Sequence, residues 1–163
     1  MTRIGLLSDT HSYLDDAILQ KLESCDEIWH AGDFGNRDVI EKLQNLKPLK
    51  GVYGNIDSKD IRLDFPEHLH FQCEEMKVFM THIGGYPGKY PTSIKNILLK
   101  EKPDLFICGH SHILKVMFDE KLQCLHLNPG AIGKQGWHQV RTLLRFSIHL
   151  NRVCDLEVVE FPR

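Results

Sequence analysis

Seven side chains that can bind a metal ion fall directly after apolar segments of the sequence. They are two carboxylates, one amide and four imidazoles: Asp9, His11, Asp33, Asn55, His82, His110 and His112. Mg²⁺ prefers oxygen ligands, and structural zinc sites favour thiolates, whereas a mixed set of this kind suits transition metals such as manganese, nickel, cobalt, zinc or iron. Seven groups exceed the needs of one ion. If one carboxylate bridges, the set divides between two ions.

Each fragment has a plainer explanation when it is taken alone. Gly32-Asp33 can be a turn, Asn55 a loop residue and His82 a hydrogen-bonded loop histidine. Gly109-His110-Ser111-His112 is the most specific fragment, although it too could be a polar turn. The five blocks occur in order, each at the end of an apolar run, and this joint pattern favours one shared site.

The apolar runs that precede these blocks predict strands, and their residue ranges are 4–7, 27–31, 49–53, 76–80 and 104–108. Ligands gather beyond the carboxyl ends of strands in α/β sheets, so residues far apart in sequence can converge there. Apolar residues at helical spacing predict helices between the strands. Ser12 and Asp15 resemble a capping box for the first helix, and Asn36 can cap the second. A third helix is expected around residues 94–98, and residues 54–66 are expected to form a polar loop.

The second half of the chain is richer in strands. Glu74-Glu75 separates two apolar segments, which predicts a tight hairpin. Further strands are expected over residues 115–118, 122–127, 142–150 and 153–161. Crossover helices early and hairpins late indicate an α/β fold of two mixed sheets, packed face to face with helices outside. We expect a single domain over residues 1–163.

Composition and charge limit the possible partners. The chain has 163 residues and a formal net charge of −2, which weighs against binding long nucleic acids or an anionic membrane. Its five cysteines are scattered and form no C-x-x-C pair, so buried free thiols are expected. The first apolar run is too short for a signal peptide, and no run reaches membrane-spanning length. We therefore expect a reduced, cytoplasmic protein. Exposed hairpin edges can pair between two copies, so a homodimer is compatible with the sequence.

The ordered blocks resemble the calcineurin-like metallophosphoesterase superfamily. The resemblance rests on Asp9-x-His11, Gly32-Asp33, Gly54-Asn55, His82 and Gly109-His110-x-His112, and it spans residues 4 to about 133. Gly54-Asn55-Ile56-Asp57 and Asn128-Pro129-Gly130-Ala131 look most like the compact bacterial and archaeal phosphodiesterase branch. The resemblance implies a four-layer α/β/β/α sandwich of two mixed β-sheets flanked by helices. It also implies a dinuclear centre, with Asp9, His11 and His112 on the first ion, Asn55, His82 and His110 on the second, and Asp33 bridging.

The implied activity is metal-dependent hydrolysis of a small phosphodiester by a metal-bridging hydroxide, with manganese favoured. Asn55 and Asp57 would take catalytic roles, with a surface loop aspartate as the alternative for Asp57. Asn55 would also contact the substrate. The Gly/Pro-rich loop 84–91 offers Lys89 and Tyr86 as further substrate contacts, with a solvated loop as the plainer alternative. Many family members have a histidine after the Gly-Asn pair, whereas this chain has Ile56. The alternative is a binding module of the same fold, like a retromer scaffold subunit with a defective metal centre. We leave His68, His70, His126, His138 and His149 without a role.

Overall fold

The computed structural model describes residues 1–163 and contains two five-stranded sheets and four helices. The first sheet has the order β10-β9-β1-β2-β3, and its strands are β1 (Thr2–Leu7), β2 (Glu27–His30), β3 (Leu49–Gly51), β9 (Val140–His149) and β10 (Arg152–Pro162). The second has the order β4-β5-β6-β8-β7, and its strands are β4 (His68–Cys73), β5 (Met76–Thr81), β6 (Leu105–Ile107), β7 (Leu114–Asp119) and β8 (Cys124–Pro129). The helices are α1 (Asp16–Leu22), α2 (Arg37–Leu46), α3 (Lys59–Asp64) and α4 (Thr92–Glu101).

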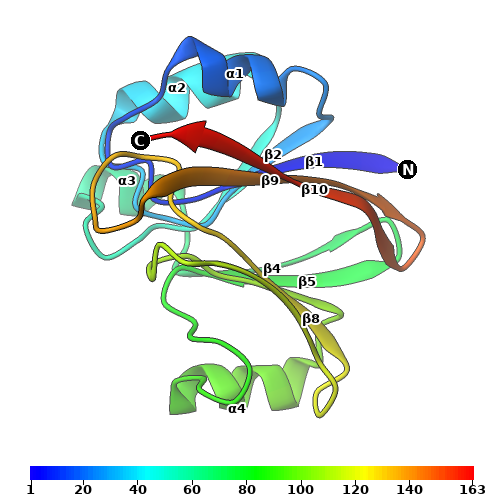
Figure 1. The fold of residues 1–163 in the computed structure, drawn as a ribbon. Helices are drawn as coiled ribbons and strands as arrows, with labels where there is room; N and C mark the ends of the chain where they lie inside the picture. The colour runs from blue at the N-terminus through cyan, green and yellow to red at the C-terminus, as the bar shows by residue number, and fades with distance from the viewer.

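The sheets pack face to face between two layers of helices. In Figure 1, α1 and α2 cover the outer face of the first sheet, and α4 covers the outer face of the second. Each sheet is mixed, because β1, β2 and β3 run parallel while β9 and β10 are antiparallel to their neighbours. In the second sheet β5, β6 and β8 run parallel, and β4 and β7 are antiparallel edge strands. The predicted four-layer α/β/β/α sandwich is confirmed.

Three apolar clusters fill the spaces between the four layers. The side chains of a strand alternate between its two faces, so Ile4 and Leu6 of β1 lie between the sheets while Leu7 packs beneath the helices. A third cluster places Phe79 and Phe106 against α4. Burial on both faces explains why the central strands read as continuous apolar runs. The strand ends are thereby fixed relative to one another.

Two local predictions were wrong. The cap of α1 is Asp15, whose carboxylate accepts a hydrogen bond from the Ile18 backbone N–H at 3.0 Å. Ser12 instead lies in a turn with a φ of 68°, because the chain must bend sharply after His11. The segment predicted as a loop contains α3, whose single buried side chain, Ile61, gives almost no apolar periodicity to detect. The Asn36 cap of α2 is confirmed, since its side chain accepts from the Val39 N–H.

All five cysteines are free thiols, and four of them are buried, as predicted. None of the helices has the length and hydropathy needed to cross a lipid bilayer. Strands β10 and β3 form the edges of the first sheet, and β4 and β7 form those of the second. The homodimer stays a prediction.

Candidate metal centre

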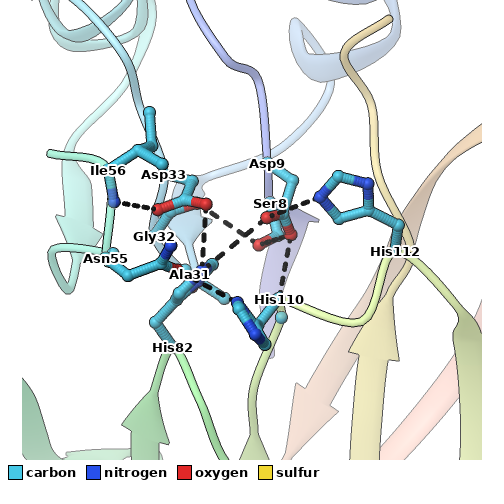
Figure 2. Close-up of polar contacts among 12 residues, drawn as sticks. Ser8, Asp9, Ala31, Gly32, Asp33, Asn55, Ile56, His82, His110 and His112 are labelled. Carbon is cyan, nitrogen blue, oxygen red and sulfur yellow. Dashed lines mark hydrogen bonds and ion pairs between the residues drawn. The ribbon is translucent and has the colours of Figure 1, made fainter. Parts of the chain in front are cut away.

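The strand ends bring the predicted ligands together in two groups. Asp9, His11 and His112 form the first group, and Asp33, His82 and His110 form the second; within each group the ligand atoms lie within 4.8 Å of one another. Asn55 belongs beside the second group, because its Oδ1 lies 3.0 Å from His110 Nδ1. In Figure 2, separate loops bring together the side chains of Asp9, Asp33, Asn55, His82, His110 and His112. The grouping matches the division of ligands that the family resemblance implies.

The carboxylate of Asp33 lies between the two groups. Its Oδ2 is 3.3 Å from Nε2 of His11, in the first group, and 3.2 Å from Nε2 of His82, in the second. Its Oδ1 accepts a hydrogen bond from the Ile56 backbone N–H at 3.1 Å. Oδ1 is thus held by a backbone hydrogen bond, and Oδ2 faces one histidine of each group.

Three buried polar atoms of the centre have no hydrogen-bond partner: Asp9 Oδ1, His11 Nε2 and His82 Nε2. Such atoms are rare in folded proteins, because each one loses its hydration without compensation. Asp9 Oδ1 lies 3.2 Å from His112 Nε2 and 3.8 Å from His82 Nε2. A carboxylate oxygen and imidazole nitrogens that face one another without partners fit divalent cations of the transition series.

Hydrogen bonds to the other atoms of these side chains fix their orientation. Asp9 Oδ2 accepts from the Ser8 hydroxyl at 2.6 Å and from the His110 backbone N–H at 3.1 Å, so Oδ1 is the free oxygen. His82 Nδ1 donates to the backbone carbonyl of Ala31 at 2.7 Å, which turns Nε2 toward the centre. Bonds of this kind select the tautomer that a metal ligand needs.

Five of the seven predicted ligands have left-handed backbone conformations: Asp9, His11, Asp33, His110 and His112 have φ values of 57°, 44°, 60°, 69° and 61°. Positive φ is uncommon outside glycine, and it recurs at functional sites where the surrounding structure holds it. Here the loops hydrogen-bond to one another, with the His11 N–H donating to the Asp33 carbonyl at 3.1 Å. The backbone turn after each strand therefore aims the side chain.

Glycines before the ligands allow close approach of the loops. A Cβ at Gly54 would overlap the Asp33 carboxylate, and a Cβ at Gly109 would overlap the Ser8 hydroxyl. Neither glycine has a positive φ, so the requirement is for space rather than for conformation. This accounts for the glycine that precedes Asn55 and His110.

Asp57 is buried, with 3% of its surface exposed, and its carboxylate belongs to neither group of metal-binding side chains. Its carboxylate accepts backbone hydrogen bonds from Asp33 at 3.0 Å, Phe34 at 3.2 Å, Gly35 at 2.9 Å and Gly54 at 2.8 Å. It therefore joins the loop of Asp33 to the loop of Asn55. This contact pattern makes Asp57 a positioning residue.

A second buried network lies beneath the centre. The Gly32 N–H donates to His30 Nδ1 at 3.1 Å, so Nε2 carries the proton and donates to the Thr10 hydroxyl at 3.0 Å. Thr10 in turn donates to the Phe34 carbonyl at 2.9 Å. Burial lowers the pKa of His30 to about 3, which keeps the ring neutral and preserves this chain of donors. Sequence reasoning missed His30, although its place at the end of β2 was the available signal.

The negative charges of Asp9 and Asp33 favour cations at the centre. The Asp33 and Asp9 carboxylates raise the pKa of His11 to about 9. Burial opposes the charges of Asp9 and Asp33, yet contacts with His11, His82 and His112 outweigh it and hold the pKa of both carboxyls below the usual range. The same negative charges that retain a proton on an imidazole attract a metal ion in its place.

The two other predicted substrate residues lie outside the two groups. Tyr86 lines a separate pocket of about 180 Å³ together with Ser111 and His126, and the Lys115 ammonium lies 4.2 Å from its ring centroid. Lys89 is exposed and makes no ion pair. Sequence reasoning also missed Ser8, whose place directly before Asp9 could have suggested its role.

The sequence matches the model of a known protein family. Residues 2–151 match the calcineurin-like phosphoesterase superfamily domain, so the chain belongs to that superfamily. Fold, family and the paired ligand groups together define a metal-dependent phosphoesterase. The resemblance inferred from the five blocks is confirmed.

Similar proteins agree with this assignment. A probable metallophosphoesterase of Methanothermobacter thermautotrophicus is 29% identical over 133 residues, which covers 78% of this chain and 76% of the relative. One of Mycoplasma pneumoniae is 26% identical and covers 100% of this chain and 99% of its own length.

Solved structures share the fold. An archaeal phosphodiesterase has a TM-score of 0.78 at 22% identity, with 98% of this chain and 99% of that chain covered. Vps29 from Entamoeba histolytica, solved as a zinc complex, has a TM-score of 0.76 at 14% identity, with 98% of each chain covered.

Proposed function

We propose that the protein is a phosphodiesterase that uses two divalent transition-metal ions, with manganese favoured, to hydrolyse a small phosphodiester. The observation that carries the proposal is the position of Asp33 Oδ2, which lies 3.3 Å from a nitrogen of one ligand group and 3.2 Å from a nitrogen of the other. When bound, two such cations acidify a shared water and neutralise charge on the phosphoryl oxygens.

The protein's own residues supply the positioning. Asp9, His11 and His112 would hold one ion, and His82, His110 and Asn55 the other, with Asp33 common to both. Asn55 is exposed at the edge of the centre, and its amide N–H can donate to a phosphoryl oxygen. Asp57 keeps the Asp33 and Asn55 loops in register through its four backbone contacts.

The leaving group receives little help from the protein. The residue after Asn55 is Ile56, which is 46% exposed and contributes only its backbone N–H to Asp33. Without a general acid, hydrolysis of an ester whose leaving alcohol is a weak acid is slower by about 10²–10⁴-fold. We therefore propose a preference for diesters with acidic leaving groups over alkyl monoesters. The net charge of −2 favours small substrates over long nucleic acids.

The test is turnover of bis(p-nitrophenyl) phosphate by metal-free protein reconstituted with Mn²⁺, Ni²⁺ or Co²⁺. We expect activity that chelation abolishes and that Asp33→Asn lowers by at least a hundredfold. Asp38→Asn, which changes an exposed carboxylate paired with Lys42 on α2, is the matched control. Absence of both turnover and metal binding would favour the alternative function as a binding module.

A further inference from the structure

A pocket of about 400 Å³ adjoins the second ligand group. Asn55 and His82 form part of its lining, and Tyr53, Arg62, His68 and Ser93 line the region beyond them. This volume is within the range of pockets that bind small organic ligands. A substrate phosphate held at the metal centre would therefore have one of its ester groups beside this pocket.

Arg62 brings an unpaired positive charge to the pocket. The two aspartates that lie near it on α3, Asp60 and Asp64, both pair with Arg37. Arg62 itself makes no ion pair, although Glu67 lines the same pocket. Arg62 is thus left without a carboxylate partner.

The guanidinium of Arg62 is also held in place. Its Nε donates to the Asp57 carbonyl at 2.8 Å, and its Nη2 donates to the Asn55 carbonyl at 3.2 Å. The group lies 4.5 Å from the centroid of the Tyr53 ring. Nη1 makes no hydrogen bond within the protein, so its donors are available to a ligand. A fixed planar guanidinium with free donors suits a carboxylate or a phosphate.

Asn55 stands between this cation and the second ligand group. Its side chain reaches His110, whereas its backbone carbonyl reaches Arg62. The metal-binding side chains and Arg62 can therefore contact different parts of one bound substrate. Thr81, His68 and Ser93 add further polar side chains to the pocket wall.

We propose that this pocket binds a second anionic group of the substrate, a carboxylate or phosphate carried on an ester group of the diester, with Arg62 as its counter-ion. The proposal rests on the phosphodiesterase function and narrows it to substrates that are anionic at two places. The pocket then acts as a specificity subsite, while the metal centre binds the phosphate that is hydrolysed.

The experiment compares short alkyl phosphonates that carry either an uncharged tail or an anionic tail. Dissociation constants for butylphosphonate, 3-phosphonopropanoate and propane-1,3-bisphosphonate are measured by calorimetry on Mn²⁺-loaded protein, and the last two distinguish a carboxylate from a phosphate-like tail. We expect the anionic tail to tighten binding about tenfold or more, since hydrogen bonds to charged groups contribute about 1.5–3 kcal/mol. Arg62→Gln should remove most of this preference. Glu67→Gln should increase it, because it removes the acidic side chain of the lining.

Arg152→Gln is the matched control, since Arg152 is an exposed arginine at the start of β10 and makes no ion pair. It should keep the wild-type preference. If Arg62→Gln weakens all ligands equally and keeps the preference, Arg62 only supports the Asn55 loop and the proposal is wrong. The proposal is also wrong if wild-type protein shows no preference for an anionic tail. The measurement requires no turnover, so failure of the hydrolase assignment would be seen separately in the diester assay.

Discussion

Asp57 and Asp33 are two buried carboxylates joined through the backbone, since the Asp33 N–H donates to Asp57 Oδ2 at 3.0 Å. Asn at position 57 would keep one acceptor oxygen and replace the other with an NH₂ group, so at least one of the four backbone N–H donors would lose its acceptor. We expect metal affinity to fall about 10- to 100-fold, as for other groups that orient metal ligands. Calorimetric titration with Mn²⁺ would measure it, with Asp38→Asn as the control. Unchanged affinity would mean that the loops hold their shape without Asp57.

The proposed bridging role of Asp33 predicts a difference in metal content between single variants. His112→Ala removes a ligand of the first group and His82→Ala one of the second, so each should retain about one tightly bound ion per chain. Asp33→Asn should weaken both ions. Elemental analysis after gel filtration would give the ratio of metal to protein, and wild-type protein should hold about two ions. Equal losses in all three variants would contradict separate groups.

The residue after Asn55 should control the response to the leaving group. Ile56→His introduces an imidazole at an exposed position whose backbone N–H contact with Asp33 need not change. We expect turnover of a methyl p-nitrophenyl diester at the aryl bond to change little. Turnover of dimethyl phosphate should rise, by up to about 10²–10⁴. The ratio of kcat/KM values across pH tests this, with Ile56→Asn as a control that cannot transfer a proton. Equal rates on aryl and alkyl esters in the wild type would contradict the inference that the protein lacks a general acid for the leaving group.

Much of the centre could be predicted from the sequence, because ligands at the ends of buried strands need only a coarse topology to be brought together. The positions of Asp9, His82 and His112 follow from that rule. The helix α3 could not be predicted, since Ile61 is its one buried residue. The proposed role of Arg62 could not be predicted either, because it depends on Asp60 and Asp64 pairing with Arg37 in the folded protein. Such pairing leaves no pattern along the chain.

Acid should destabilise the fold through its buried neutral histidines. Burial lowers the pKa of His126 to about 4. The unfolded chain, with a histidine pKa near 6.5, therefore binds a proton first as pH falls, and stability is lost between about pH 6.5 and 4. His126→Leu should remove roughly 1–2 kcal/mol of the loss seen between pH 7 and 5. Urea unfolding at several pH values measures this.

The matched control for this test is His149→Gln, which alters an exposed histidine at the end of β9. It should keep the wild-type slope of stability against pH. His30 also stays neutral when buried, so the slope in His126→Leu should be reduced rather than abolished. A slope equal to that of the wild type would show that folding does not lower the pKa of His126.

Each ligand group draws on both sheets. Asp9 and His11 follow β1 of the first sheet, whereas His112 follows β6 of the second; likewise Asp33 follows β2 and His82 follows β5. An ion bound to either group would thus fasten the two halves of the sandwich across their open end, and its binding energy would add to the cohesion of the fold. Removing the ions with a chelator should accordingly lower the melting temperature. It should also speed amide hydrogen exchange first in the loops that carry the two ligand groups. Bound cations would then hold the two sheets together in addition to any role in hydrolysis.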